Sequence, residues 1–239
     1  MGDAFKANAN FIYWQSGVPT INPVFADNDW SAIIYACQHN MVPDTWVADG
    51  SCYKDMEING TNYRIDIIGK NHDTYADGGT APLTFQMHDC YSEPYVLSGV
   101  GVRPAWTECE MRTSTLPMLL ELMPAVVRLN VREVVKVTAQ YPGDNTKVET
   151  NDKLFLLSGS EIFNFPTNSF AGEGNRYEYY IQQSSGAIKR VVNGTSVWWW
   201  LRSPVSAGLP NVYVAVVTSG GSTNAPGTYS EYIAFAFCF

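Results

Sequence analysis

The spacing of hydrophobic and polar positions predicts a first helix near the start of the chain. Its apolar residues recur at positions i, i+3, i+4 and i+7, the pattern of a helix with one buried side: Trp30, Ile33, Ile34 and Cys37. Asn28-Asp29 stand directly before this pattern and can cap the first turn. We therefore expect a helix over about 29–40, ended before Pro43.

A second helix is predicted in the middle of the chain. Thr115 can act as its N-cap, and Pro117 falls near the first turn, where proline is tolerated. Its apolar side is expected to consist of Leu116, Leu119, Leu120 and Met123.

Short strands account for most of the remaining pattern. Asn59-Gly60 is a strong hairpin signal between 54–59 and 61–69, where Tyr63, Ile65 and Ile67 alternate with polar residues. Further strands are expected at 83–87, 131–138, 154–157, 197–201, 211–218 and 232–239. Long irregular connections separate these elements, so the pattern indicates a loop-rich α+β domain. Residues 1–24 lack periodicity and are interpreted as an arm or attachment segment before one domain, 25–239.

The last strand is apolar on both faces. Phe235, Phe237 and Phe239 point one way, while Ala234, Ala236 and Cys238 point the other way. A strand of this composition is expected to be central and buried. In the run Trp198–Trp200, alternation separates Trp199 from its neighbours, and we expect at least two of the three rings in the core. Arg202 is expected to bind a buried acid or a backbone carbonyl.

Composition narrows the possible partners. The 239 residues are 46% hydrophobic and only 16% charged, which excludes a disordered chain. A net charge of −8 argues against nucleic acid, since phosphate binding needs clustered Lys and Arg. No apolar run is long enough for a membrane helix, and the first residues show no signal-peptide pattern. We therefore expect no nucleic acid and no membrane insertion.

The cysteines give no metal-binding pattern. The five are Cys37, Cys52, Cys90, Cys109 and Cys238, and none forms a CxxC pair. All five are expected to be reduced, although a Cys52–Cys90 or Cys90–Cys109 bridge remains an alternative.

Candidate catalytic residues are isolated. His72 adjoins Asp73, but neighbours on a strand point to opposite faces, so a hydrogen-bonded turn is favoured over a base or metal ligand. No serine has the GxSxG context of a nucleophile. Calcium remains a possible cofactor through loop oxygens, although the spacing fits no EF-hand: Asp73, Asp77, Asp144, Asn145, Asn151 and Asp152. No catalytic or metal residue is therefore predicted.

The region 198–239 differs from the rest of the chain. It opens with WWWLRSP, includes VTSGGS and closes with IAFAFCF, while residues 203–232 contain no Lys, Arg or His and one acid, Glu231. These segments resemble the C-terminal variable region of C-type-lectin-fold proteins diversified by retroelements. Further blocks that resemble this family lie in order along the chain: FADNDWSAII (25–34), IDIIGKNHDTYADGGTAPLTFQ (65–86), MRTSTLPMLLELMP (111–124) and DKLFLLSGSEIF (152–163).

The resemblance implies an irregular C-type-lectin-like fold, with two main helices around a mostly antiparallel twisted sheet. It also implies a fixed frame and a set of altered positions. The positions matching the altered ones are Val205, Ala207, Gly208, Leu209, Tyr213, Val216, Thr218, Asn224, Ala225, Pro226, Tyr229 and Glu231. Tyr232, where the family usually has Gly, is added as a contact because large amphipathic side chains suit binding surfaces.

The expected function is therefore non-enzymatic display of a ligand-binding surface at about 205–232. The partner would be a protein or glycan receptor, and the resemblance implies a phage tail tip or a bacterial surface. A homo-oligomer remains open. The alternatives are a structural tail or adhesin module and, less favoured, a relative of the formylglycine-generating oxidases, which would need reactive cysteines or a metal cluster.

Overall fold

The predicted first hairpin is present in the computed structural model, which describes residues 17–99, 106–164, 168–182, 188, 190–209, 211–216 and 219–239. Strands β1 (Tyr53–Ile58) and β2 (Thr61–Lys70) pair antiparallel, with Ile58 opposite Thr61. Asn59 and Gly60 form the turn with φ of 50° and 77°. This left-handed conformation is why an Asn-Gly pair favours a two-residue hairpin.

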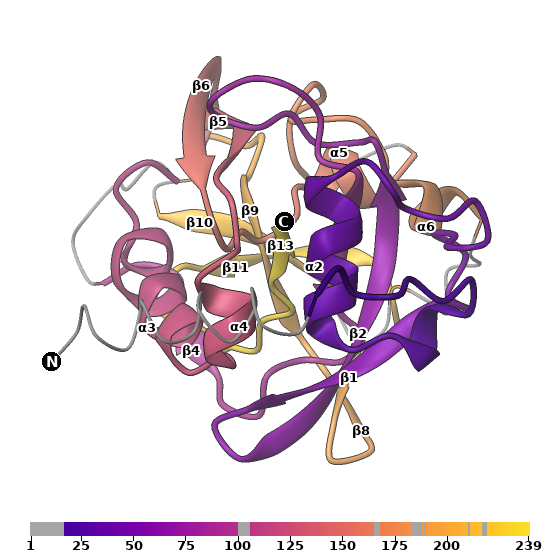
Figure 1. Cartoon of the computed structure of the whole chain (residues 1–239). Helices are drawn as coiled ribbons and strands as arrows, with labels where there is room; N and C mark the ends of the chain where they lie inside the picture. The colour runs from indigo at the N-terminus through magenta and orange to yellow at the C-terminus, as the bar shows by residue number, and fades with distance from the viewer. Residues whose placement is uncertain are drawn as a thin grey trace, which may run out of the picture.

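A four-stranded antiparallel sheet forms one side of the core, in the order β1-β2-β3-β13. It includes β3 (Leu83–Met87), as predicted, and β13 (Ala236–Cys238). Helix α2 (Trp30–Gln38) follows the short 3₁₀ helix η1 (Phe25–Asp27). The Asp29 side chain caps α2 at Ala32 N, as expected. The ring of Trp30 lies 5.9 Å from that of Phe85, so α2 packs on this sheet (Figure 1).

The C-terminal segment is buried along its whole length. Residues 233–239 are all 0% exposed, which confirms the prediction of a buried strand. Only Ala236–Cys238 is a regular strand, however, and it lies at the end of its sheet rather than at the centre. Single bridges to Phe155 and Arg132 cover its other edge. The predicted strand at 154–157 contributes only this Phe155 bridge.

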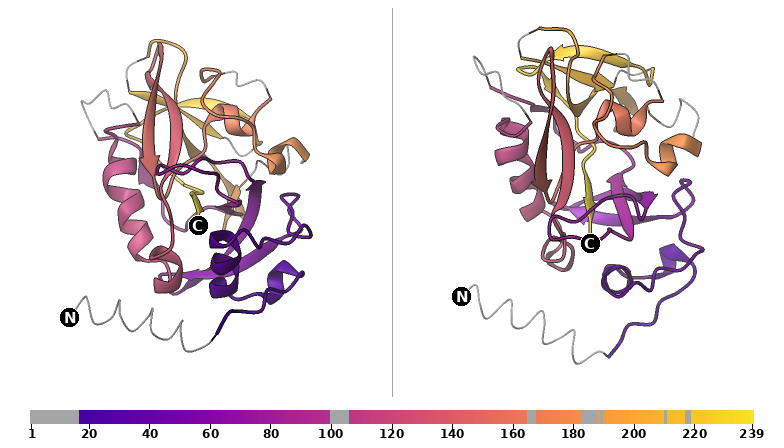
Figure 2. Two further views of the ribbon diagram at one scale, coloured as in Figure 1. Left: turned by 45° about the horizontal axis from the view of Figure 1, so that its top comes forward. Right: turned by 90° about the horizontal axis from the view of Figure 1, so that it is seen from above.

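A second sheet and a long hairpin form the other end of the molecule. Strands β9 (Trp199–Pro204), β10 (Val212–Val216) and β11 (Ser222–Pro226) pair antiparallel in the order β11-β10-β9. Strands β5 (Val134–Tyr141) and β6 (Asp144–Asp152) form the hairpin. Figure 2 shows that this hairpin and the second sheet lie away from α2 and β1. The pattern predicted β5 three residues early and missed β6.

The second predicted helix begins earlier than expected. A π-helical segment, η2 (Met111–Thr115), runs directly into α3 (Leu116–Glu121). Thr115 is therefore already helical and makes no capping hydrogen bond, so its predicted role as N-cap was wrong. A short helix missed by the periodicity, α4 (Ala125–Arg128), follows after Pro124.

The remaining elements are short and were not predicted. Helix α5 (Gly159–Ile162) contacts β9 of the second sheet, whereas α6 (Glu178–Gln182) contacts β2 of the first sheet. Strands β7 (Arg190–Val192) and β8 (Thr195–Val197) form a hairpin, and β4 (Tyr95–Val96) pairs with β12 (Ser230–Glu231). The expected mixed α+β architecture with antiparallel strand pairing is thus confirmed. Within the described residues, no helix combines the length and apolar composition needed to cross a membrane.

The boundary of the predicted arm falls inside the described residues. Residues 1–16 lie outside them, but Asn22 already belongs to the packed structure. Its carbonyl accepts hydrogen bonds from Trp46 Nε1 at 3.2 Å and from Asn28 Nδ2 at 3.0 Å.

Candidate functional site

Strand β9 connects the interior of the fold to the predicted binding region. Trp199 and Trp200 are both fully buried, one on each side of the strand, while Trp198 before it is 37% exposed. The indole nitrogens of the two buried rings donate to the carbonyls of Ile188 and Tyr95. This confirms that at least two of the three tryptophans are core residues, and it leaves one exposed ring.

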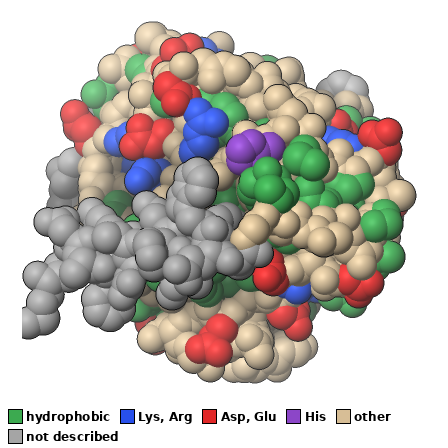
Figure 3. All heavy atoms as spheres, in the orientation of Figure 1, with side chains coloured by type: hydrophobic (Ala, Val, Ile, Leu, Met, Phe, Trp, Pro, Cys, Tyr) green, Lys and Arg blue, Asp and Glu red, His purple; other side chains and the backbone are tan. Residues whose placement is uncertain are grey.

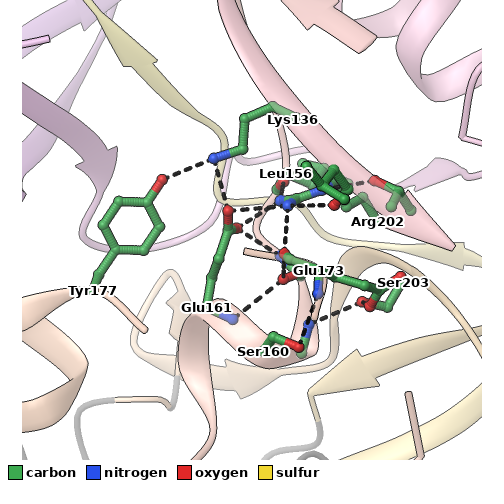
Figure 4. Close-up of polar contacts among 12 residues, drawn as sticks. Lys136, Leu156, Ser160, Glu161, Glu173, Tyr177, Arg202 and Ser203 are labelled. Carbon is green, nitrogen blue, oxygen red and sulfur yellow. Dashed lines mark hydrogen bonds and ion pairs between the residues drawn. The ribbon is translucent and has the colours of Figure 1, made fainter. Parts of the chain in front are cut away.

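Arg202, in the same strand, is the centre of a buried polar cluster (Figure 4). Its Nη1 and Nη2 donate to the two carboxylate oxygens of Glu161 at 2.5 and 3.0 Å. Further donations reach the carbonyls of Leu156, at 2.8 Å, and Glu173, at 2.9 Å. Such bidentate pairing uses the planar guanidinium fully. The prediction that Arg202 binds a buried acid or a carbonyl is confirmed on both counts.

Lys136 extends this cluster toward the first sheet. Its ammonium lies 2.7 Å from Glu161 Oε1 and 2.7 Å from Asp73 Oδ1, and it also donates to the Tyr177 hydroxyl at 3.0 Å. Asp73 in turn accepts from Thr84 Oγ1 at 2.5 Å. Four separate parts of the chain therefore meet at two carboxylates and two cations.

The protonation states follow from this pairing. Burial alone would raise the pKa of Asp73 and of Glu161. Lys136 at Asp73, and Arg202 with Lys136 at Glu161, outweigh burial and hold both pKa values below their usual range. Asp73 and Glu161 are thus ionised, and their two negative charges balance the two cations.

The Glu161 carboxylate packs directly against the backbone of a glycine, Gly174, which has no side chain to displace it. Gly174 has a φ of 104°, and a Cβ there would lie 2.7 Å from Glu161 Oε1. The Ser158–Glu161 pair also forms a capping box at the start of α5. Both contacts fix the carboxylate toward Arg202.

Glu173 is a third buried carboxyl group and behaves differently. Its Oε1 accepts from Ala139 N at 2.8 Å, and its Oε2 accepts from the Ser203 hydroxyl. Arg202 reaches the backbone carbonyl of Glu173, not its carboxyl group. Burial therefore dominates and raises the pKa of Glu173, in spite of these hydrogen bonds.

We expect the Glu173→Gln variant to gain stability relative to the parent protein as the pH rises. With a raised native pKa, the parent is favoured below about 4.5, the ordinary value, and loses stability as the pH rises through the native pKa. Urea denaturation at about pH 5 and about pH 8 measures the difference, which should grow by about 1.4 kcal/mol for each unit of raised pKa. Glu149→Gln, on the exposed side of β6, controls for removing a carboxylate elsewhere in the same region. Parallel pH profiles for the parent and Glu173→Gln would contradict a raised pKa.

A surface cavity of about 430 Å³ opens above the cluster, between β5 and the loops that carry His72 and Asn175. His72 stacks on Tyr177 at 3.9 Å between ring centroids, and its Nε2 lies 3.2 Å from the Asn175 carbonyl. Asp73, although adjacent to His72, faces Lys136 inside. The described lining residues include no cysteine or serine, and the buried ionisable ones are paired with one another. The cavity is therefore the point where the buried ion pairs come close to the protein surface.

The thiols are free and mostly buried. None of the five cysteines forms a disulfide, including those of the two alternative bridges. Burial raises the pKa of Cys37 to about 12 and that of Cys109 to about 12, and raises the pKa of Cys90 and Cys238. Thiolates, the reactive form of cysteine, are therefore disfavoured at these four positions at neutral pH.

The residues considered for calcium binding do not converge. Asp77 pairs with Arg132 at 2.6 Å, and Asp152 pairs with Arg112 at 2.6 Å. Asp144 begins β6 at the tip of the β5–β6 hairpin, whereas Asp73 is buried and pairs with Lys136. Among the described residues, no group of three or more His, Cys, Asp or Glu side chains is placed to hold a metal.

Part of the predicted binding region is at the surface. Ala207, Gly208 and Leu209 form an exposed loop after β9, Asn224 is exposed on β11, and Tyr229 is 56% exposed. Three further predicted residues are half-buried: Pro226, Glu231 and Tyr232. Thr218 lies outside the described residues. We call the five exposed residues the display surface.

Four predicted contact residues are in the core: Val205, Tyr213, Val216 and Ala225. Their expected exposure was wrong. Tyr213 and Val216 lie on β10, the middle strand of its sheet, and both of its faces are covered. Val205 bridges Ser169, and Ala225 pairs with Tyr213 across the sheet. A Cβ on Gly227 would come within 3.1 Å of the Tyr213 ring, which shows how tightly that ring is enclosed. These side chains are not accessible to a binding partner in the folded protein, so they contribute to the core beneath the exposed residues.

The cluster residues Lys136, Glu161 and Glu173 were not predicted from the sequence. Ser158 and Glu161 have the S-x-x-E spacing of a capping box, so that signal was readable. No local pattern links Lys136 to Asp73, which lies 63 positions away.

On the face drawn in Figure 3, the described Lys and Arg side chains lie among acidic ones and form no continuous basic patch. This distribution agrees with the net charge of −8.

Comparison with known proteins identifies one family. The family model described as a domain of unknown function (DUF6273) matches residues 104–235. No curated protein and no solved structure matches the chain. The matched residues span more than half of the chain and include Lys136, Glu161, Glu173, Arg202 and the whole display surface. The chain therefore belongs to the DUF6273 family.

Proposed function

We propose that this protein displays a ligand-binding surface on a stable scaffold and has no enzymatic role. The surface consists of Ala207, Gly208, Leu209, Asn224 and Tyr229, with Pro226, Glu231 and Tyr232 at its margin. The observation that carries the proposal is the sharp change in burial along the C-terminal region. Fully buried segments at 199–203 and 233–239 enclose exposed, uncharged positions.

The scaffold supports substitution at the surface. A Cβ added to Gly208 would meet no atom within 4 Å, and its φ lies outside the left-handed region, so other residues fit there. Arg202, only a few positions earlier, is fully buried and is hydrogen-bonded to Glu161 of α5 and to the Val137 carbonyl of β5. Side chains at the surface can therefore change without disturbing the ion-paired core.

The chemistry of the surface suits recognition. Leu209 is 47% and Tyr229 is 56% exposed, although both are large and partly apolar. Tyrosine offers a rigid, amphipathic contact at low entropic cost, while Asn and Gly offer adaptable ones.

We infer that the partner is a protein receptor. Two of the three consecutive tryptophans are fully buried, so this run offers one ring rather than a row of rings for stacking on a glycan. The resemblance to retroelement-diversified C-type-lectin-fold proteins supports a lectin-like fold and a phage tail tip or bacterial surface as the context. A reverse transcriptase gene and a near-copy of the 3′ end that differs at adenines should then lie beside this gene. If the genome lacks both, diversification is excluded while binding itself is not.

Selection tests the binding proposal directly. A display library randomised at Ala207, Gly208, Leu209, Asn224 and Tyr229 should yield folded variants that bind a model target protein, lysozyme. Randomising five exposed positions of the β7–β8 and β1–β2 hairpins instead provides a matched control library. Failure to obtain binders from a folded display library, or equal success with the control, would favour a purely structural module.

A further inference from the structure

The tip of the β5–β6 hairpin touches the backbone of the display surface. Gly143 N donates to the Val205 carbonyl at 3.0 Å, directly before the exposed loop 206–209. A Cβ on Gly143 would lie 2.7 Å from Gly208 Cα and 3.2 Å from Gly208 N. Two backbones in such close approach need glycine at this point. The hairpin tip and the loop therefore form one continuous surface.

The loop is held from a second side by residues that also lie outside 205–232. Ser206 N donates to the Asn168 carbonyl at 2.8 Å, and Ser169 bridges Val205. The amide of Asn168 also donates to the Ser222 carbonyl at 3.1 Å. Contacts from two distant segments thus determine where loop 206–209 points.

The hairpin tip differs chemically from the loop. It presents the half-buried Tyr141 and Asp144 and the exposed Asn145, with Lys147 donating to the Asn145 side chain. Hydrogen bonding by Thr146 keeps the pKa of Asp144 below its usual range, so this residue is ionised. The tip therefore carries the negative charge of Asp144, with the positive charge of Lys147 beside it, next to a loop that has no charge. Protein interfaces commonly combine a weakly charged centre with a polar rim.

We propose that the hairpin tip 141–145 is the constant half of a composite binding surface for a folded protein, with loop 206–209 as the changeable half. This inference rests on the proposed function. Gly143 acts in it as a positioning residue, because its lack of a side chain allows the loop to rest on the hairpin. The neighbouring Tyr141 and Asn145 make contacts common to different partners.

Gly143→Ala tests the positioning role, with Gly60→Ala as a matched control. Both glycines have similar left-handed φ, 80° and 77°, so alanine adds similar backbone strain at each. Only Gly143 faces another backbone, since a Cβ on Gly60 meets nothing within 4 Å. Amide NMR shifts of residues 206–209 should change in Gly143→Ala and remain unchanged in Gly60→Ala. Unchanged shifts in both variants would show that the hairpin does not position the loop.

The binding role is tested with the lysozyme-binding variants selected from the display library. Asn145→Arg should weaken their affinity by about tenfold or more, because a bulky charge would enter the interface. Ser196→Arg, on the exposed β7–β8 hairpin, should change the affinity by less than about twofold. If binders are obtained but Asn145→Arg leaves their affinity unchanged, the composite surface is wrong and the display surface acts alone. If no binders are obtained, the proposed function itself fails.

Discussion

Replacing Glu161 by Gln should lower the free energy of unfolding by about 3–5 kcal/mol, the usual loss when one partner of a buried ion pair is removed. Glutamine keeps the shape of the side chain but removes the carboxylate that pairs with Arg202. Lys136 then keeps only its ion pair with Asp73. Both cations are almost fully inaccessible to water, at 0% and 3% side-chain exposure. Urea denaturation at neutral pH measures the effect.

Two further variants separate charge from general disruption. Glu149→Gln removes an exposed carboxylate from the same region and should change stability by less than about 0.5 kcal/mol. Combining Glu161→Gln with Lys136→Met should cost less than the sum of the two single changes, because the double variant removes one charge of each sign. Additive losses would show that the cluster is not an electrostatic unit.

The second large effect is expected at Phe237. Its ring lies 5.4 Å from those of Phe85 and Phe239, in the layer where β13 meets β3 under α2. Phe237→Ala removes this buried ring and leaves a cavity, so we expect a loss of about 3–5 kcal/mol in the free energy of unfolding.

Surface variants provide the comparison for Phe237. Tyr229→Ala and Asn224→Ala should each stay within about 0.5 kcal/mol of the parent protein in the same denaturation experiment. Tyr213→Ala, by contrast, should behave like Phe237→Ala, since its ring is fully buried. Losses of similar size at all four positions would mean that the exposed residues are part of the core.

Local patterns predicted the elements whose burial is one-sided or complete. Helix α2 follows from the period of Trp30, Ile33, Ile34 and Cys37, and the β1–β2 hairpin follows from Asn59-Gly60. The core position of two tryptophans and the pairing of Arg202 were also predictable, because buried aromatic and cationic groups have few stable environments. These inferences need no knowledge of distant contacts.

The remaining features depend on contacts between distant residues. Tyr213 and Val216 match altered positions of the family that the chain resembles, but covering of both faces of β10 buries them. Asp73, Lys136 and Glu161 lie on different elements, so no periodicity joins them. The β7–β8 hairpin, in contrast, carries a local signal, the Asn193-Gly194 turn, although its strands were not predicted. The resemblance predicted a binding region at about 205–232 but did not separate its buried positions from its exposed ones.

The most direct test of a stable scaffold with a changeable surface is the stability of unselected library members. Variants randomised at Ala207, Gly208, Leu209, Asn224 and Tyr229 are purified without selection and unfolded in urea. If the surface is independent of the core, most of them should unfold cooperatively within about 1–2 kcal/mol of the parent protein. Widespread loss of folding among them would contradict the division between scaffold and display surface.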